Sequence, residues 1–295
     1  MATVQGLDIS SCQTSVDFKK VKQAGYDYVI LRINEWNRVT KDIMKDTKFE
    51  QYYKDAKAAG LKVGAYYFTY ANTIDYVAYE AKTVINWLKG KQFEYPIYFD
   101  LEREEQFAQG KTFCDKAVTT FCDALEKAGY FAGVYCSTYW YTTCVSQSVR
   151  ERYACWIAEW GSKCNYTGTY GAWQNGTATV PGINGGVDHD FCYVDYPSII
   201  KSKGLNGFPK PSKELPTLDT GSCYKLGETT VGALAVKELL RLAYAKKMHS
   251  VIVTESKVYD STAAEAVSYL QTIWGYKATG RAGENFVKRI TADLK

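Results

Sequence analysis

Histidine is scarce in this sequence: His189 and His249 are the only two among 295 residues. Nucleophilic pairs such as Ser–His and Cys–His need a histidine as the base that activates the nucleophile. The sequence therefore offers few ways to build such a pair. Any hydrolytic chemistry is expected to depend on carboxylates.

Long apolar runs and a strong excess of one charge are also missing. No stretch approaches the roughly 18–20 apolar residues that a membrane-spanning helix needs, so we expect no membrane insertion. The N-terminus, MATVQGLDIS, has neither the basic nor the apolar region of a secretory signal. The net charge of +4 is too small to indicate a nucleic-acid partner. These features predict a protein made in the cytoplasm without a signal peptide.

The nine cysteines form no recognisable framework. An odd number in a long chain without a signal peptide argues against structural disulfides. No CxxC pair occurs, and the Cys and His spacing is too wide for a structural zinc site. Most of the thiols are expected to be buried as small hydrophobic groups in a reducing cytoplasm. We expect no metal and no other cofactor.

Aromatic residues are abundant, at 15%, with 25 Tyr and 7 Trp. Rings that carry a polar group suit flat, hydroxyl-rich ligands such as sugars, but tyrosine is also a common packing residue. Composition leaves both interpretations open.

The first two hundred residues alternate strand-like and helix-like segments, which indicates parallel βαβ units. Eight strands are predicted, at Gly6–Ser10, Tyr28–Ile33, Lys62–Phe68, Pro96–Glu102, Ala132–Ser137, Cys155–Trp160, Ala172–Asn175 and Gly186–Phe191. Helical patterns between the early strands include Asp46–Ala59, Ile74–Leu88 and Thr112–Ala128. The last two gaps are too short and too rich in Gly, Thr and Asn for helical crossovers. The fold class expected is α/β, an irregular TIM-like barrel with about five helices, whose last strands need not all run parallel.

A change of composition after Phe208 predicts a domain boundary. We expect the barrel at residues 1–208, a proline-rich linker at 209–219 and a small, mainly helical domain at 220–295. Two segments of this last domain, Gly232–Tyr244 and Thr262–Trp274, have apolar residues at helical spacing.

Carboxylates follow the apolar part of the fourth predicted strand, in Tyr-Pro-Ile-Tyr-Phe-Asp-Leu-Glu. Asp100 and Glu102 are two residues apart, so a strand would place both on one face, at the end where barrel enzymes carry catalytic groups. Two close acids raise the pKa of at least one of them. Glycosidic bond cleavage uses such a pair, one as proton donor and one beside the positive centre. A solvated strand end is the alternative.

Asp8 and the pair Asp188 and Asp190 lie on the first and last predicted strands, which are neighbours in a closed barrel. They should therefore converge with Asp100 and Glu102, and the motifs supply no basic residue to balance them. Such a costly arrangement indicates function. A Mg²⁺ or Ca²⁺ site is the rival interpretation of clustered carboxylates.

These motifs, in this order, resemble those of the glycoside hydrolase family 25 lysozymes. The matching segments are GLDIS at 6–10, VGAYYF at 63–68, YFDLE at 98–102, GVYCS at 133–137, CWIAEW at 155–160, WQ at 173–174 and GVDHDF at 186–191. The resemblance implies a barrel of eight strands and five helices, with Glu102 as general acid. It also implies that Asp100 orients the N-acetyl group of the substrate or stabilises the positive centre, and that Asp8 and Asp188 assist.

The same resemblance implies that Tyr66, Tyr135 and Trp173 line the sugar-binding groove, although packing inside the barrel is the alternative. The family usually carries a Leu-Asn-like pair after the Val-Asp of strand eight. This sequence has His189-Asp190 there, and Asp190 is expected to contact substrate.

The C-terminal segment Tyr224–Ile290 resembles, more weakly, a peptidoglycan-binding domain of three helices. Its matching pieces include Val258-Tyr259-Asp260 and Trp274-Gly275-Tyr276. A dimerisation domain, which would make the protein a homo-oligomer, or a structural appendage are the alternatives.

The resemblance as a whole implies a lysozyme that cleaves the β-1,4 bond between N-acetylmuramic acid and N-acetylglucosamine, with bacterial peptidoglycan as its partner. A chitinase-like hydrolase and a wall-binding protein without activity are the competing hypotheses. Action on the cell wall without a signal peptide would fit a phage-type endolysin or a protein exported by another route.

Overall fold

The computed structural model describes residues 3–210 and 215–295. The chain forms two compact units, Met1–Pro211 and Ser212–Lys295, each with its own apolar core. The linker expected at 209–219 falls partly on residues 211–214, which lie outside the described residues. Its last part belongs to the second unit, because Asp219 accepts hydrogen bonds from the backbone N–H groups of Gly283, Asn285 and Phe286.

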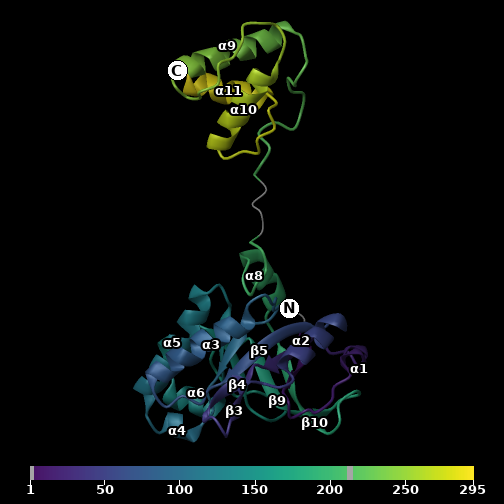
Figure 1. Ribbon diagram of the computed structural model, residues 1–295, viewed down its shortest axis with the longest axis vertical. Coiled ribbons are helices and arrows are strands. Elements are labelled where there is room, and N and C mark those ends of the chain that lie inside the picture. The colour runs from purple at the N-terminus through teal and green to yellow at the C-terminus, as the bar shows by residue number, and fades with distance from the viewer. Residues whose placement is uncertain (1–2, 211–214) are drawn as a thin grey trace. The chain divides into compact units, whose positions relative to one another are not determined.

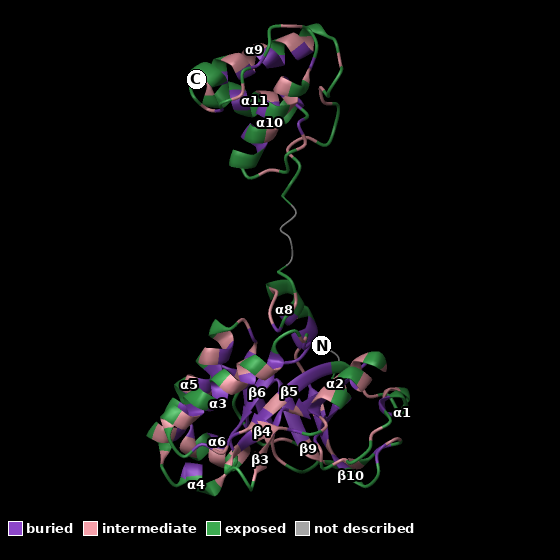
Figure 2. Cartoon of the chain, viewed as in Figure 1, coloured by how far each residue is buried: buried purple, intermediate pink, exposed green. Residues whose placement is uncertain are grey.

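The first unit is a closed barrel of eight strands, in the order β1-β10-β9-β8-β7-β6-β5-β2 (Figure 1). The strands are β1 (Val4–Ile9), β2 (Tyr28–Arg32), β5 (Lys62–Phe68), β6 (Ile97–Asp100), β7 (Ala132–Ser137), β8 (Ala154–Ala158), β9 (Ala172–Thr179) and β10 (Gly186–Cys192). All eight overlap the predicted strands, and the predicted α/β barrel is confirmed. In Figure 2 its strands are mostly buried, whereas the surrounding helices expose their outer sides.

Helices fill the connections between successive parallel strands from β1 to β8. They are α1 (Phe18–Gln23), α2 (Phe49–Ala58), α3 (Ile74–Leu88), α4 (Glu104–Phe107), α5 (Lys111–Lys127), α6 (Thr138–Cys144) and α7 (Gln147–Arg150). Another helix, α8 (Tyr196–Lys203), follows the last strand. α3 begins at the predicted residue because Thr73 accepts a hydrogen bond from the backbone N–H of Tyr76.

The last connections have no helix, as the sequence predicted. β8 and β9 are parallel and joined by a helix-free loop, whereas β10 runs antiparallel to both β9 and β1. A hairpin that the sequence did not reveal, β3 (Asn34–Asn37) with β4 (Asp42–Lys45), is inserted between β2 and α2.

Tyrosine fills much of the barrel interior. Tyr28, Tyr98 and Tyr135 pack there with Trp156. Space for these rings comes from glycine on neighbouring strands: a Cβ at Gly133 would lie 2.5 Å from the Tyr98 ring. Part of the aromatic content is therefore structural, which supports the packing interpretation of the composition.

The second unit packs three helices, α9 (Val231–Ala245), α10 (Ser261–Ile273) and α11 (Glu284–Asp293), around an apolar core. One charged group lies inside it. The ammonium of Lys237, whose side chain is 0% exposed, donates to Asp260 at 2.7 Å and also to Thr254, Ser256 and the carbonyl of Val258.

Two further observations concern the described part of the chain. Its helices include none with the length and apolar character required to cross a membrane. All nine cysteines are unpaired, and five of them are buried: Cys114, Cys122, Cys136, Cys155 and Cys192.

Candidate active site

Four of the predicted acidic residues meet at one rim of the barrel. Asp8 lies near the end of β1, Asp100 ends β6, and Glu102 follows two residues later. β10 runs the opposite way, so its early residue Asp188 pairs with Asp8 at the same rim. Their charges interact: Asp188 and Glu102 both raise the pKa of Asp8, and Glu102 and Asp8 raise that of Asp100, although burial is the largest cause in each case.

Gln174 holds Asp8 in place. Its amide Nε2 donates to Asp8 Oδ2 at 2.9 Å, and its Oε1 accepts from the hydroxyl of Tyr135 at 3.0 Å. The indole N–H of Trp160 donates to the same Oε1 at 3.1 Å. Asp8 is only 7% exposed, and burial together with Asp188 raises its pKa to about 8, despite the bond from Gln174. Burial and Asp188 therefore favour the protonated form of Asp8.

Asp100 and Glu102 differ in their surroundings. Asp100 is 3% exposed, burial raises its pKa well above the usual range, and its Oδ1 has no hydrogen-bond partner among residues 3–210 and 215–295. Glu102 is accessible to solvent, as an acid that meets a substrate must be. Desolvation by the surrounding protein, and then the charge of Asp188, raises its pKa as well. A carboxylic acid that stays protonated and reachable can donate a proton.

Asp190 lies deeper than its predicted neighbours. It is fully buried and accepts a hydrogen bond from the indole of Trp156 at 2.8 Å, and burial raises its pKa well above the usual range. Asp188 and Asp190 are two residues apart on β10, so strand periodicity turns both toward the same side. The register shift beside them leaves Asn175 of β9 without a partner on β10. Asp190 and Asp8 lie close enough for each to affect the pKa of the other.

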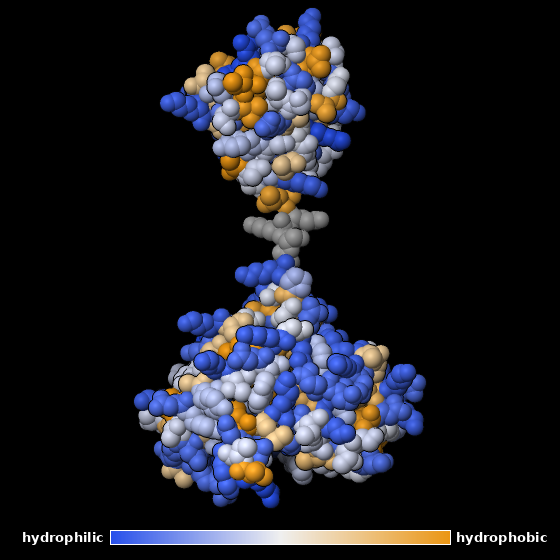
Figure 3. Space-filling model, viewed as in Figure 1, coloured by the Kyte–Doolittle hydropathy of each residue, from blue (hydrophilic) through white to orange (hydrophobic). Residues whose placement is uncertain are grey.

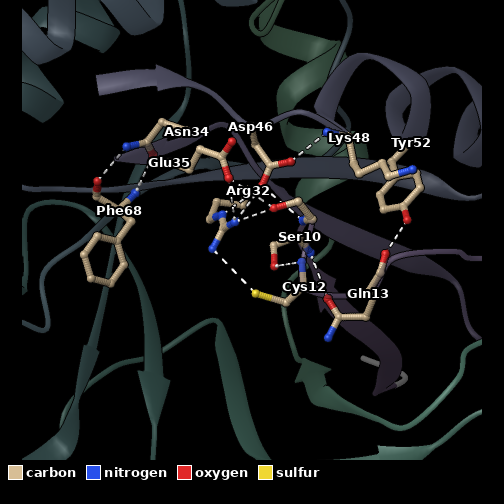
Figure 4. A network of polar contacts seen from close by, with 11 residues as sticks. Ser10, Cys12, Gln13, Arg32, Asn34, Glu35, Asp46, Lys48, Tyr52 and Phe68 are labelled. Atoms are coloured by element: carbon tan, nitrogen blue, oxygen red, sulfur yellow. Dashed lines mark hydrogen bonds and ion pairs between the residues drawn. The ribbon is translucent and has the colours of Figure 1, made fainter. Parts of the chain in front are cut away.

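A basic residue that the sequence did not reveal affects the pKa of this acidic group, and Figure 4 shows its polar contacts. Arg32, the last residue of β2, donates to Asp46 at 2.9 Å and to the hydroxyl of Ser11 at 2.8 Å, and it lies 3.8 Å from Glu35. Its charge opposes the rise in the pKa of Asp100. The motifs contain no cation, as the sequence shows, and β2 supplies this one from outside them.

The aromatic residues expected to line the groove divide between two faces. Tyr66 and Tyr135 point into the barrel, where their rings lie 6.0 Å and 4.5 Å from that of Trp156. The structure does not bring Trp173 to this group. It packs in the outer core, its indole donates to the carbonyl of Glu159 at 2.8 Å, and the inward position belongs to Gln174.

The carboxylates of the rim are not arranged as a metal site. Within the described residues, no three Cys, His, Asp or Glu side chains form a group that could hold a metal ion.

Replacing Asp8 with Asn should change the pH dependence of stability. The pKa of Asp8 is about 8 in the folded protein and near 3.8 ordinarily, so the free energy of unfolding should fall between roughly pH 4 and pH 8 as the unfolded chain loses the proton. Asp8→Asn removes that loss and keeps an acceptor for Gln174. The melting temperature of the variant, measured relative to that of the parent protein, should therefore increase as pH rises from 4 to 8. The exposed Asp75→Asn serves as control, and a large destabilisation of Asp8→Asn at pH 8 would contradict this account.

Sequence comparison shows which known proteins share this barrel. The profile of a family described as "Glycosyl hydrolases family 25" matches residues 7–182. The autolytic lysozyme of Clostridium acetobutylicum is 32% identical over 189 residues, which cover 63% of this chain and 55% of that protein. Lysozyme M1 of Streptomyces globisporus is 26% identical over 203 residues, covering 63% and 67%.

Comparison of structures gives a similar result. The crystal structure of the CTP1L endolysin matches with a TM-score of 0.58 and 26% identity, over 69% of this chain and 70% of the other. The match thus spans about half the length of the autolytic lysozyme, and about two thirds of the lengths of lysozyme M1 and the CTP1L endolysin. The matched family profile ends at residue 182, before the second unit begins.

Proposed function

Because the chain belongs to glycosyl hydrolases family 25, we propose that it cleaves the β-1,4 bond between N-acetylmuramic acid and N-acetylglucosamine in bacterial peptidoglycan. The observation that carries the proposal is the pair of acids at the end of β6, one buried and one accessible, both with raised pKa. It is supported by the names of the relatives, an autolytic lysozyme, a lysozyme and an endolysin.

In this proposal Glu102 protonates the oxygen of the leaving sugar. Asp100, whose Oδ1 has no partner among the described residues, accepts the N–H of the substrate's acetamido group and so orients it beside the carbon where positive charge develops. Burial and the charge of Asp188 help to keep Glu102 protonated, and Asp8 completes the acidic group around the pair. Tyr66 and Tyr135 present rings to the sugar at the inner end of the site.

A test that separates this activity from its competitors uses two insoluble polymers. The purified protein should lower the turbidity of a peptidoglycan suspension and release soluble fragments, while chitin stays intact. Fragments from chitin would favour the chitinase-like hypothesis. Binding to peptidoglycan without any soluble product would favour a wall-binding protein that has no activity.

The pH profile should depend on Asp188. Burial and the charge of Asp188 raise the pKa of Glu102, so Glu102 stays protonated to a higher pH than an ordinary glutamate, and the rate should fall as pH rises through that raised value. Asp188→Asn removes the charge and lowers the pKa of Glu102. The alkaline limb of kcat/KM on soluble fragments should therefore move to lower pH. If the alkaline limb of the variant stays at the pH of the parent protein, the ionisation of Glu102 does not determine that limb.

We propose further that the second unit binds the cell wall. A chain that ends at Lys210 should fold, since the first unit has its own core, and should cleave soluble glycan fragments at the normal rate. On intact walls it should be slower, because linking two weak binding sites raises apparent affinity by about 10²–10⁴-fold. Equal rates of the full-length and the shortened chain on whole walls would contradict this role. Homodimerisation through the second unit would then be the better hypothesis, and the masses of the two chains in solution would test it.

A further inference from the structure

Several large apolar side chains of the second unit are exposed. Figure 3 shows hydrophobic patches among hydrophilic side chains on the visible face of this unit. Large exposed apolar and aromatic residues of the unit are Leu215, Leu226, Val231, Leu242, Tyr244, Ile252, Val258, Tyr269 and Ile273. Two of these, Tyr244 and Tyr269, line the same hollow.

This hollow lies beside the end of α9 and the middle of α10. Its volume is about 480 Å³, within the range of roughly 300–1,000 Å³ usual for small-ligand sites. Tyr244 and Tyr269 are 42% and 45% exposed, so part of each ring is free to stack on a ligand. The remaining lining residues are Ala245, Lys247, His249 and Ser250.

The wall behind the tyrosines is buried and hydrogen-bonded. His249 is 4% exposed, its Nε2 lies 2.9 Å from the carbonyl of Leu240, and its Nδ1 lies 3.2 Å from the backbone N–H of Val251. Burial lowers the pKa of His249, which fits a neutral ring that donates from Nε2 and accepts at Nδ1. A fixed wall costs a ligand little ordering when it binds.

Lys247 occupies a strained position at the edge of the hollow. It lies two residues after α9 ends at Ala245 and has a φ of 60°. The backbone N–H groups of Lys247 and Met248 donate to the carbonyls of Tyr244 and Ala243. Glycine is the usual residue at this position of a helix end. The ends of α1, α2, α5 and α10 follow that rule, with Gly25, Gly60, Gly129 and Gly275 at positive φ. A lysine that tolerates this strain indicates a use for its side chain.

The chemistry of the lining selects a ligand. Two aromatic rings suit the C–H faces of a sugar, and Lys247 and Ser250 can donate hydrogen bonds to hydroxyl or acetamido oxygens. Lys247 and Ser250 are the exposed hydrogen-bond donors beside the two rings. We propose that this hollow binds an N-acetylated amino sugar of the wall glycan. The inference rests on the proposed function and names the site through which the second unit acts.

The test measures pelleting of the full-length protein with insoluble peptidoglycan and with chitin, a polymer of N-acetylated amino sugars that carries no peptide. All variants also carry Glu102→Gln, so that the polymers stay intact. Tyr244→Ala and Tyr269→Ala should each weaken binding to both polymers by about 10-fold, the effect of losing one aromatic anchor. Tyr244→Phe should keep binding because the ring remains. Leu242→Ala, exposed on α9 but outside the lining, is the matched control.

Lys247→Gly separates binding from folding. Removing the strain should raise the melting temperature of the second unit by a few degrees, whereas loss of the amine should weaken binding. If the role of Lys247 is only structural, Lys247→Gly should change the melting temperature and leave binding unchanged.

Unchanged binding by both tyrosine-to-alanine variants would overturn the inference, and loss of binding to peptidoglycan by a protein that never binds chitin would point to a peptide ligand instead. Neither result bears on the activity proposed for the barrel. The proposed function fails separately, if the parent protein with Glu102 intact releases no fragments from peptidoglycan.

Discussion

Glu102→Gln is expected to lower kcat/KM on soluble peptidoglycan fragments by about 10²–10⁴-fold, the usual contribution of a general acid. The amide has nearly the shape of the acid but no proton to give to the leaving oxygen. Since Glu102 is accessible to solvent at the end of β6, folding should be unaffected. Initial rates and the melting temperature of the first unit are the measurements.

The control for this variant is Glu104→Gln, the same chemical change two residues further along the chain, where α4 begins. Glu104 is exposed and does not belong to the acidic group at the rim. It should retain the parent rate. Near-normal lysis by Glu102→Gln, or an equal loss in both variants, would defeat the assignment of Glu102.

Asp260→Ala should destabilise the second unit by about 3–5 kcal/mol, the cost of leaving a buried charge without its partner. Lys237 is completely buried, and Asp260 is the acidic residue that faces its ammonium. Burial alone would raise the pKa of Asp260, but hydrogen bonds from Lys237, Thr254 and Thr262 hold it well below the usual range. Asp260 also caps α10, through a bond from the N–H of Ala263. Urea unfolding of the second unit measures the loss.

Two companion variants identify the cause of that loss. Lys237→Met removes the buried charge itself, so it should cost less than Asp260→Ala, and the double variant should be more stable than the sum of the two single changes predicts. Because the pKa of Asp260 is lowered, its contribution should be present above about pH 4 and disappear as pH falls further. Strictly additive effects would show that the two side chains do not stabilise each other.

The barrel strands could be located from sequence because each combines an apolar face with a clear boundary. The segment Lys62–Phe68 was predicted with the limits that the structure gives it. The hairpin of β3 and β4 escaped notice because NEWN and DIMK show no regular alternation of apolar and polar residues. Its pairing is a contact between two short polar segments, which local patterns do not encode.

The site was less accessible to sequence reasoning than the fold. The proximity of Asp100 and Glu102 follows from strand periodicity, but the cation beside them does not: Arg32 is held by Asp46 and Ser11, which lie on separate connections. Trp173 shows a second limit. A strand alternates its faces, so a single residue decides which side chain points inward, and only the pairing of β9 with its neighbours places Gln174 there.

The chemical identity of the ends released from purified peptidoglycan tests the central proposal most directly. After digestion, the new reducing ends are reduced with borohydride, hydrolysed and analysed by mass spectrometry. Cleavage at the bond proposed here exposes N-acetylmuramic acid, so reduced muramic acid should accumulate in step with the fall in turbidity, and Glu102→Gln should release almost none. Reduced glucosamine in its place, or lysis without any new reducing end, would contradict the account.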